Sequence, residues 1–283
     1  MKIAVTAANG QLGSAIAQQL IEDIGPDQVI AIARTPSKAE FLGIEVRKGD
    51  YNSRADFDAA LRGVDAVLLV SGKDAPDKRI PQHRNVIEAA KANGLQRIVY
   101  TSIIGDEGGT AFNPIVKSNR QTEEDVRNSG LEWSIGRNSI YIEPDLAYLD
   151  NYIKKGKIWN CAGDGLCAYT HRKELAHAYS KMLREAQHHG QTYNLAGEAI
   201  SQAQLAELFN QVYGTQLFYE AMSVENYTES CKEELGDFLG TVIAGIYHGI
   251  RNGASNPPSH FEIAAGRPHK SMLQIMQEHK ASA

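Results

Sequence analysis

The chain has 283 residues and a formal net charge of −5, a length that allows one large domain or one domain with a smaller lobe. Its composition is ordinary for a globular protein, with no long basic run and no apolar stretch near the ~20 residues that span a bilayer. We therefore expect neither nucleic acid nor a membrane as a partner.

The cysteines argue against a disulfide framework and against a metal site. Cys161, Cys167 and Cys231 are odd in number and lack the spacing typical of metal ligands. Three free thiols suit a reducing compartment. The N-terminus enters an apolar segment directly, without the layout of a signal peptide. We expect a cytoplasmic protein that binds no metal.

The first half of the chain alternates short apolar runs with helical patterns. We predict strands over 2–6, 29–33, 44–48, 64–70, 97–101 and 132–136, and helices over 11–22, 81–92 and 114–128. The run 64–70 (VDAVLLV) is nearly all apolar, as in a strand covered on both faces. Such alternation predicts an α/β fold, a Rossmann-type doubly wound parallel sheet with right-handed crossovers.

The alternation weakens after Asn138. We predict strands over 157–160 and 191–195 and helices over 172–185 and 204–213; from about 215 the pattern is mainly helical and ends with an amphipathic stretch over 272–278. Ser201 and Gln204 have the spacing of a capping box. We therefore predict a nucleotide-binding Rossmann domain over 1–150 and a small, mainly helical lobe on the substrate side over 151–283. Segments of the lobe within about 157–213 are expected to return to the sheet.

The segment between the first strand and the first helix has the features of a dinucleotide phosphate loop. Gly10 and Gly13 stand where backbone N–H groups at a helix start bind a pyrophosphate. We predict cofactor contacts from the loop, namely Thr6, Ala7, Ala8, Asn9, Gly10, Gln11 and Leu12. Ala7 replaces the first glycine of the usual pattern, and alanine is expected to fit only if its φ stays negative.

Arg34, directly after the second strand, indicates which cofactor is bound. A site that prefers NAD(H) has an acidic residue here for the ribose hydroxyls, whereas an arginine suits a 2′-phosphate. Lys38 adds positive charge one turn later. We predict that NADP(H) is preferred over NAD(H).

Further cofactor contacts are expected where other strands end. Asp50 and Tyr51 follow the third strand, where Asp50 either accepts a hydrogen bond from the adenine amino group or acts as a turn residue. The remaining candidates follow or end the fourth and fifth strands, where the dinucleotide would pass: Ser71, Gly72, Thr101 and Ser102.

Several motifs together resemble one family. They are VTAANGQLG, ARTPSK, RKGDY, PQHRNVIEAAK, YTS, GRNSIY and YNLAG. Their order and spacing resemble the NmrA-like atypical short-chain dehydrogenases, and most closely the bacterial NADPH-dependent quinone oxidoreductases and triphenylmethane reductases. The resemblance implies that NADP(H) is held by Ala7 to Leu12 and Arg34. It also places Asn138 and Tyr141 beside the nicotinamide and substrate, and residues 163–169 along the cleft.

The acid–base pair of typical short-chain dehydrogenases is incomplete in this chain. Those enzymes use Tyr-x-x-x-Lys, in which the lysine lowers the pKa of the tyrosine. Lys117 stands where the lysine would be, but Asn113 replaces the tyrosine. Lys117 either orients ribose and substrate or is a solvated helix-start lysine. Tyr169 and Lys173 have the right spacing but lie beyond the sixth strand, so we discount them.

The missing tyrosine favours reduction of electron-poor acceptors, because oxidation of alcohols or epimerisation of sugars needs a base that removes a hydroxyl proton. We predict an NADPH-dependent oxidoreductase that reduces quinones or similar small aromatic acceptors. Lys117, Asn138 and Tyr141 are the catalytic candidates, and Tyr141, Ser102 or water supplies the proton. The alternative is a non-catalytic NAD(P)-binding redox sensor of the NmrA type, with a homodimer or a protein partner. A nucleotide-sugar epimerase is a third, weaker alternative.

Overall fold

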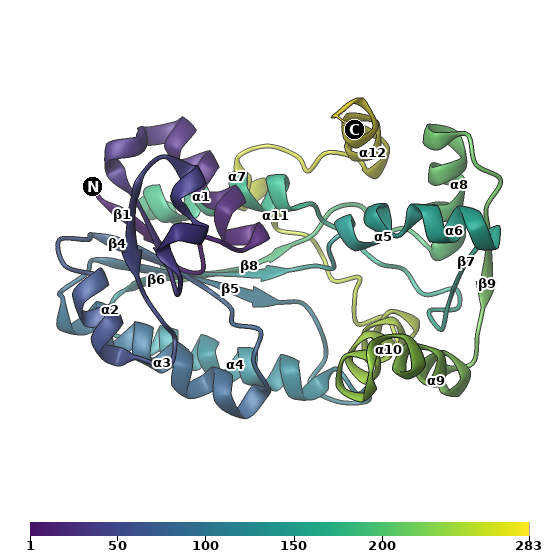
Figure 1. Cartoon of the computed structure of the whole chain (residues 1–283), viewed down its shortest axis with the longest axis horizontal. Coiled ribbons are helices and arrows are strands. Elements are labelled where there is room, and N and C mark those ends of the chain that lie inside the picture. Colours follow the sequence, from purple (N-terminus) through teal and green to yellow (C-terminus); the bar gives the residue numbers. More distant parts are fainter. Residues whose placement is uncertain (283) are drawn as a thin grey trace.

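The computed structural model describes residues 1–282 and contains a seven-stranded parallel sheet (Figure 1). The strand order is β3-β2-β1-β4-β5-β6-β8. These strands are β1 (Ile3–Val5), β2 (Val29–Ala33), β3 (Glu45–Lys48), β4 (Ala66–Val70), β5 (Arg97–Ile103), β6 (Glu132–Asn138) and β8 (Gln191–Leu195). The order reverses between β1 and β4, and ligands of doubly wound sheets bind at such a reversal, outside the carboxyl ends of the strands.

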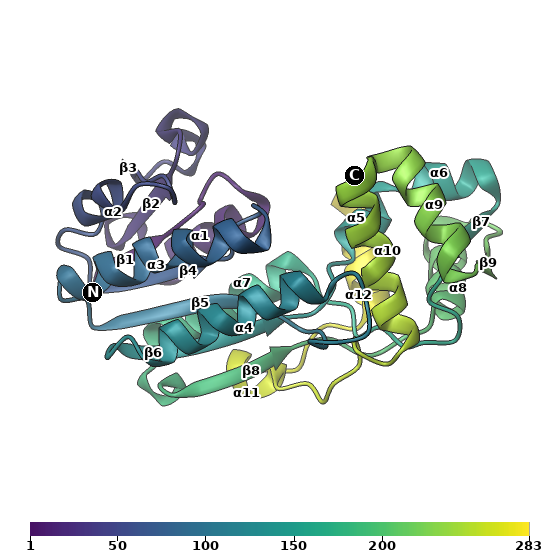
Figure 2. The same ribbon diagram turned by 90° about the horizontal axis from the view of Figure 1, so that it is seen from below.

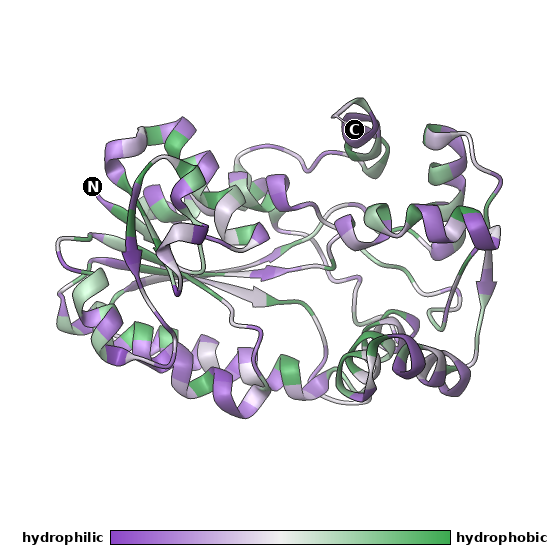
Figure 3. Ribbon diagram, in the orientation of Figure 1, coloured by the Kyte–Doolittle hydropathy of each residue, from purple (hydrophilic) through white to green (hydrophobic). Residues whose placement is uncertain are grey.

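Helices cover both faces of the sheet (Figure 1). One layer contains α1 (Gln11–Ile24), α7 (Arg172–Arg184) and α11 (Phe261–Ala265), and the other α2 (Arg54–Ala60), α3 (Pro76–Ala92) and α4 (Asn113–Arg127). Every residue of β1, β2 and β4 is buried, as the continuous apolar runs of these strands require. Figure 3 shows largely apolar central strands between helices of mixed character. The predicted Rossmann-type α/β fold is confirmed.

The C-terminal lobe lies beyond the carboxyl ends of the strands (Figures 1 and 2). It contains α5 (Glu143–Ala147), α6 (Leu149–Lys155), α8 (Gln202–Tyr213), α9 (Val224–Leu235), α10 (Asp237–Arg251) and α12 (Met272–Ser282), with a two-stranded sheet of β7 (Lys157–Asn160) and β9 (Phe218–Ala221). Its own apolar cluster includes Phe209 and Ile250. The mainly helical character predicted for this region is confirmed.

Local sequence signals located most helices and strands but did not predict which strands pair with each other. Of the two strands predicted within 157–213, β8 joins the main sheet beside β6, whereas β7 pairs with β9 instead. Neither β9 nor α2 was predicted. Helix α3 begins at Pro76, before the predicted start, and accommodates Pro81 inside. The capping box of Ser201 and Gln204 is present at the start of α8. Among the helices described, none is both long and apolar enough to cross a membrane.

Candidate functional site

The phosphate loop lies between β1 and the start of α1, at the reversal of strand order. The N–H of Gly10 donates to the carbonyl of Ala7 (2.9 Å), and the N–H of Ala8 donates to Ile32 of β2 (3.0 Å). A Cβ atom on Gly13 would lie 2.5 Å from the Ala7 oxygen, so only glycine lets the helix pack this close to the loop. The first-turn N–H groups of α1 have no intrahelical acceptors and suit a pyrophosphate.

Ala7 adopts a conformation that we did not expect. Its φ is +49°, in the left-handed region, so the expectation that φ stays negative is wrong. The cause is the tight turn, because the Ala7 carbonyl both accepts from Gly10 and faces Gly13. Alanine keeps the glycine-like backbone here, at a cost of roughly 1–2 kcal/mol for its methyl group.

Arg34 and Lys38 lie just beyond the carboxyl end of β2. Arg34 directly follows this strand, and Lys38 ends a short 3-10 turn over Pro36–Lys38. Both side chains are exposed. They can therefore approach a phosphate on the adenine ribose without breaking buried contacts.

The side chains of Thr6 and Tyr51 join β1, β4 and the segment after β3. Thr6 Oγ1 donates to the carbonyl of Leu68 (2.9 Å) and accepts from the N–H of Val70 (2.9 Å). The Tyr51 hydroxyl donates to the carbonyl of Val70 (2.6 Å). Both hydroxyl groups therefore already make hydrogen bonds within the protein. Any contact of Thr6 or Tyr51 with a cofactor would be made by their other atoms.

Asp50 has a partner within its own loop. Its Oδ1 accepts from the backbone N–H (2.9 Å) and the side-chain amide (3.1 Å) of Asn52. This is the turn role that we considered as the alternative to adenine recognition. The carboxylate remains half-exposed, and the adenine contact stays a prediction.

The segment after β4 is fixed by a buried histidine. The Gly72 N–H donates to Nε2 of His83 (2.9 Å), and the other ring nitrogen lies 2.9 Å from Thr122 Oγ1. Burial and the nearby positive charge of Arg79 lower the pKa of His83 to about 3, so the ring stays neutral and Nε2 stays an acceptor. The Ser71 N–H donates to Thr101 Oγ1 (2.9 Å).

Ser102 is committed to an internal ion cluster. Its hydroxyl donates to the buried carboxylate of Glu123 (2.7 Å), which also pairs with Arg120 (2.9 Å) and Arg137 (2.7 Å). These cations and the Ser102 hydroxyl hold the pKa of Glu123 below its usual value despite burial. The geometry therefore favours Tyr141 over Ser102 as a proton donor.

Asn138 and Tyr141 form a polar cluster at the end of β6. Asn138 Nδ2 donates to the Tyr141 hydroxyl oxygen (3.0 Å), while Asn138 Oδ1 accepts from Tyr179 of α7 (2.7 Å). Gly136 makes room for Tyr179, because a Cβ atom at this position would collide with its hydroxyl. Burial raises the pKa of Tyr141. Since Asn138 occupies a lone pair of Tyr141, the Tyr141 proton is free to be donated.

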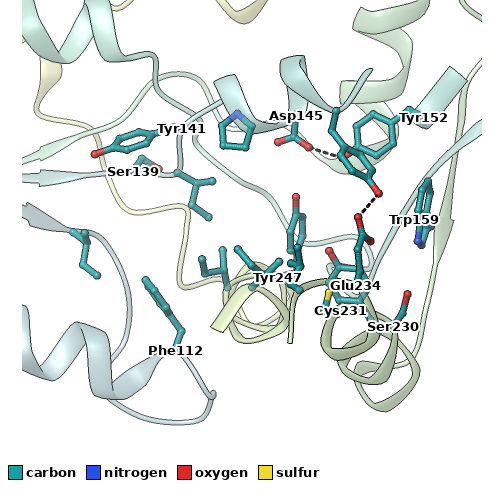
Figure 4. Close-up of a pocket in the computed structure, with 18 of the residues that line it drawn as sticks. Phe112, Ser139, Tyr141, Asp145, Tyr152, Trp159, Ser230, Cys231, Glu234 and Tyr247 are labelled. Carbon is teal, nitrogen blue, oxygen red and sulfur yellow. Dashed lines mark hydrogen bonds between the residues drawn. The ribbon is translucent and has the colours of Figure 1, made fainter. Parts of the chain in front are cut away.

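A cavity of about 440 Å³ opens beside this cluster, between the strand ends and the lobe (Figure 4). Its walls are mostly apolar and aromatic, including Phe112, Tyr148, Trp159 and Tyr247. Asn138 is one of its polar lining residues, and Ser139 and Tyr141 provide polar groups on one side (Figure 4). The Ser139 Oγ is buried without a hydrogen-bond partner in the structure, so it can bind a ligand atom.

Two predicted parts of the site do not line this cavity among the residues described. Lys117 has an exposed side chain and is absent from the cavity wall, because α4 turns its neighbours Val116 and Ser118 inward instead. Residues 163–169 do not line this cavity within the described chain, so that expectation is wrong. Gly165 packs against the backbone of Ile250, and Tyr169 is buried with its hydroxyl accepting from Gln202 (2.9 Å).

Sequence reasoning missed Ser139, Asp145 and Tyr179 as site residues. Ser139 lay within the GRNSIY motif without being singled out, and it could have been found from its place after a strand end. Tyr179 and Asp145 carry no local signal, because their roles come from long-range packing against Asn138 and against the cavity.

Comparisons with known proteins agree with this arrangement. Residues 7–157 match a family model described as NAD(P)H-binding. The chain is 36% identical over 256 residues to quinone oxidoreductase 2 of Escherichia coli (strain K12), covering 89% of this chain and 88% of that protein.

Solved structures of similar proteins share the fold over nearly the whole chain. An NADPH-dependent quinone oxidoreductase from Escherichia coli complexed with NADPH superposes with a TM-score of 0.90 at 33% identity, covering 98% of this chain and 99% of the other. The Citrobacter sp. triphenylmethane reductase complexed with NADP(H) gives a TM-score of 0.91 at 29% identity, with 99% of each chain covered.

Proposed function

The chain belongs to the NAD(P)H-binding, NmrA-like family of atypical short-chain dehydrogenases and is an NAD(P)H-dependent oxidoreductase; on that premise we propose that it reduces quinones or related small aromatic acceptors with NADPH. The observation that carries the proposal is the position of the Asn138–Tyr141 pair. It lies at the carboxyl end of β6 and lines an aromatic cavity large enough for a small flat acceptor.

The residues of the cofactor site fit NADPH. The glycines at positions 10 and 13 let the loop pack tightly against the start of α1, because a Cβ atom at either position would crowd the Ala7 carbonyl, and the N–H groups at the start of α1 would hold the pyrophosphate. Arg34 would hold the 2′-phosphate with its planar guanidinium, which supports NADPH over NADH. When bound, the nicotinamide supplies a hydride to the acceptor.

The protein contributes positioning and a proton. A quinone becomes a hydroquinone by gaining one hydride and one proton. The Tyr141 hydroxyl donates the proton to the acceptor oxygen and is later reprotonated from solvent, while Asn138 fixes its orientation. The guanidinium of Arg172 lies 4.9 Å from the centre of the Tyr141 ring and favours the transient phenolate. Ser139 offers a second hydrogen bond to the bound acceptor.

The same residues make alcohol oxidation and sugar epimerisation unsuitable. Both need a base that removes a hydroxyl proton, and the usual tyrosine is Asn113 here. Burial raises the pKa of Tyr141, so this phenol stays protonated near neutral pH and is not available to remove a hydroxyl proton. A phenol that keeps its proton suits an acceptor that must be protonated.

The proposal is tested by mixing purified protein with NADPH and a panel of quinones and following loss of nicotinamide absorbance, with NADH in parallel. We expect quinone-dependent oxidation that is faster with NADPH at limiting cofactor. Cofactor binding without oxidation by any acceptor would instead support the non-catalytic sensor. Tighter binding of NADH than NADPH would refute the role given to Arg34.

A further inference from the structure

Asp145 is a buried carboxylate in the wall of the substrate cavity. It lies on α5 between Tyr141 and Tyr152 (Figure 4) and is only 4% exposed. Its Oδ1 accepts a hydrogen bond from the Tyr152 hydroxyl (2.8 Å). The proton transfer proposed for Tyr141 does not use this side chain.

The cavity has no positive charge to balance Asp145. Among the residues described, its lining includes Asp145 and Glu234 but no lysine, arginine or histidine. Glu234 is exposed and accepts from the Tyr148 hydroxyl (2.9 Å), so water screens it more than Asp145. Arg172, whose guanidinium lies 4.9 Å from the centre of the Tyr141 ring, is 3.5 Å from Glu143 and is outside the lining.

An ionised carboxylate that has no neighbouring cation in an apolar cavity wall interacts electrostatically with any charged ligand that enters the cavity. It repels an anionic ligand and attracts a cationic one, and the effect grows as water is excluded. The aromatic faces of Tyr148, Tyr152, Trp159 and Tyr247 reinforce this preference, because their π systems also favour cations.

We propose that Asp145 is a specificity-determining residue that makes the cavity select cationic aromatic acceptors over neutral ones and exclude anionic ones. This inference rests on the proposed reductase function and adds the charge class of its acceptor. Asp145 acts through binding and is not a proton donor in the reaction.

The ionisation of Asp145 gives this selectivity a pH dependence. Burial raises the pKa of Asp145 to about 6, and hydrogen bonds from Tyr152 and Tyr247 oppose that shift. Five groups from the surrounding elements interact with it: Tyr152, Tyr227, Tyr247, Tyr169 and Cys167. Burial raises the pKa of each, so all stay neutral at neutral pH. The charge preference is therefore present above about pH 6 and fades below it.

The test compares three naphthoquinones that share one ring system: the parent compound, a sulfonate and a derivative bearing a trimethylammonium group. We expect kcat/KM at about pH 7.5 to be at least roughly tenfold higher for the cation than for the sulfonate, and this ratio to shrink at about pH 5. Asp145→Asn keeps the acceptor for Tyr152, so it should fold. It should bring the ratio to within about threefold and remove most of its pH dependence.

Two other variants serve as comparisons. Asp150→Asn removes the same charge from an exposed position on α6 and should leave the ratio unchanged. Glu234→Gln should lower the ratio less than Asp145→Asn, because Glu234 is exposed at the rim. NADPH affinity should stay the same in Asp145→Asn, which separates acceptor selection from cofactor binding.

Equal kcat/KM for the cation and the sulfonate in the wild type would overturn the proposal, as would an unchanged ratio in Asp145→Asn. If no quinone is turned over, the reductase function fails but the charge selection can still be tested. Equilibrium binding of the three compounds to the NADPH-loaded protein then gives the order directly. Binding in the order cation, neutral, anion supports the inference, and any other order overturns it.

Discussion

Replacing Ala7 by glycine should stabilise the protein. Ala7 has a φ of +49°, and a non-glycine residue in the left-handed region costs roughly 1–2 kcal/mol. Glycine removes that strain but adds about 0.5–1 kcal/mol of unfolded-state entropy. The difference is a net gain of about 0.5–1 kcal/mol, or roughly 1–3 °C in Tm for a chain of this size.

The assay is thermal unfolding without cofactor, with Ala7→Val as the matched control. Valine is branched at Cβ and tolerates this conformation less well than alanine, so its Tm should fall below that of the wild type. The order of Tm should be glycine, alanine, valine. A lower Tm for Ala7→Gly, or equal values for alanine and valine, would show that the loop does not hold this residue in the left-handed region.

Three further outcomes follow from other parts of the site. Arg34→Gln should raise the Kd for NADPH about tenfold and leave that for NADH nearly unchanged in fluorescence titrations, and equal losses would contradict a 2′-phosphate contact. Tyr141→Phe should lower kcat roughly 100-fold without weakening NADPH binding, whereas Lys117→Met should leave kcat unchanged. The reverse pattern would show that Lys117, and not Tyr141, is the catalytic residue. The pKa of His83 is lowered to about 3 in the folded state, so the unfolded chain binds more protons below about pH 6.5, and this residue should reduce the free energy of unfolding by roughly 2 kcal/mol by pH 5. Urea titrations of wild type and His83→Gln check this, since the variant should lose that part of the pH slope.

Local patterns in the sequence were sufficient to locate the strands of the main sheet and the turn between β1 and α1. Continuous apolar runs predicted β2 with its observed bounds and β4 to within two residues, because strands covered on both faces need them. The pairing of β7 with β9 could not be predicted, since the two strands lie far apart in the chain and carry no pairing signal of their own. Even the loop prediction failed at Ala7, where backbone packing overrides the preference of the residue.

The substrate side was less predictable because it depends on contacts between distant segments. Asn138 and Tyr141 were predicted from a motif in which they are three residues apart, and the structure joins their side chains by a hydrogen bond. Tyr179 donates a hydrogen bond to Asn138 although the two residues are 41 positions apart in the chain. Asp145 lines the cavity because of the way α5 packs. The position of Lys117 after β5 predicted a role in the site, but the rotation of α4 leaves its side chain exposed to solvent.

The most direct test of the proposed function is a single-turnover measurement. Protein in excess over NADPH is mixed with a neutral quinone without oxygen, and nicotinamide absorbance and hydroquinone are measured together. We predict that one hydroquinone forms per NADPH consumed, and that deuterium at the transferred position of the nicotinamide slows the reaction. Bound NADPH that persists in the presence of quinone, with no hydroquinone formed, would contradict it.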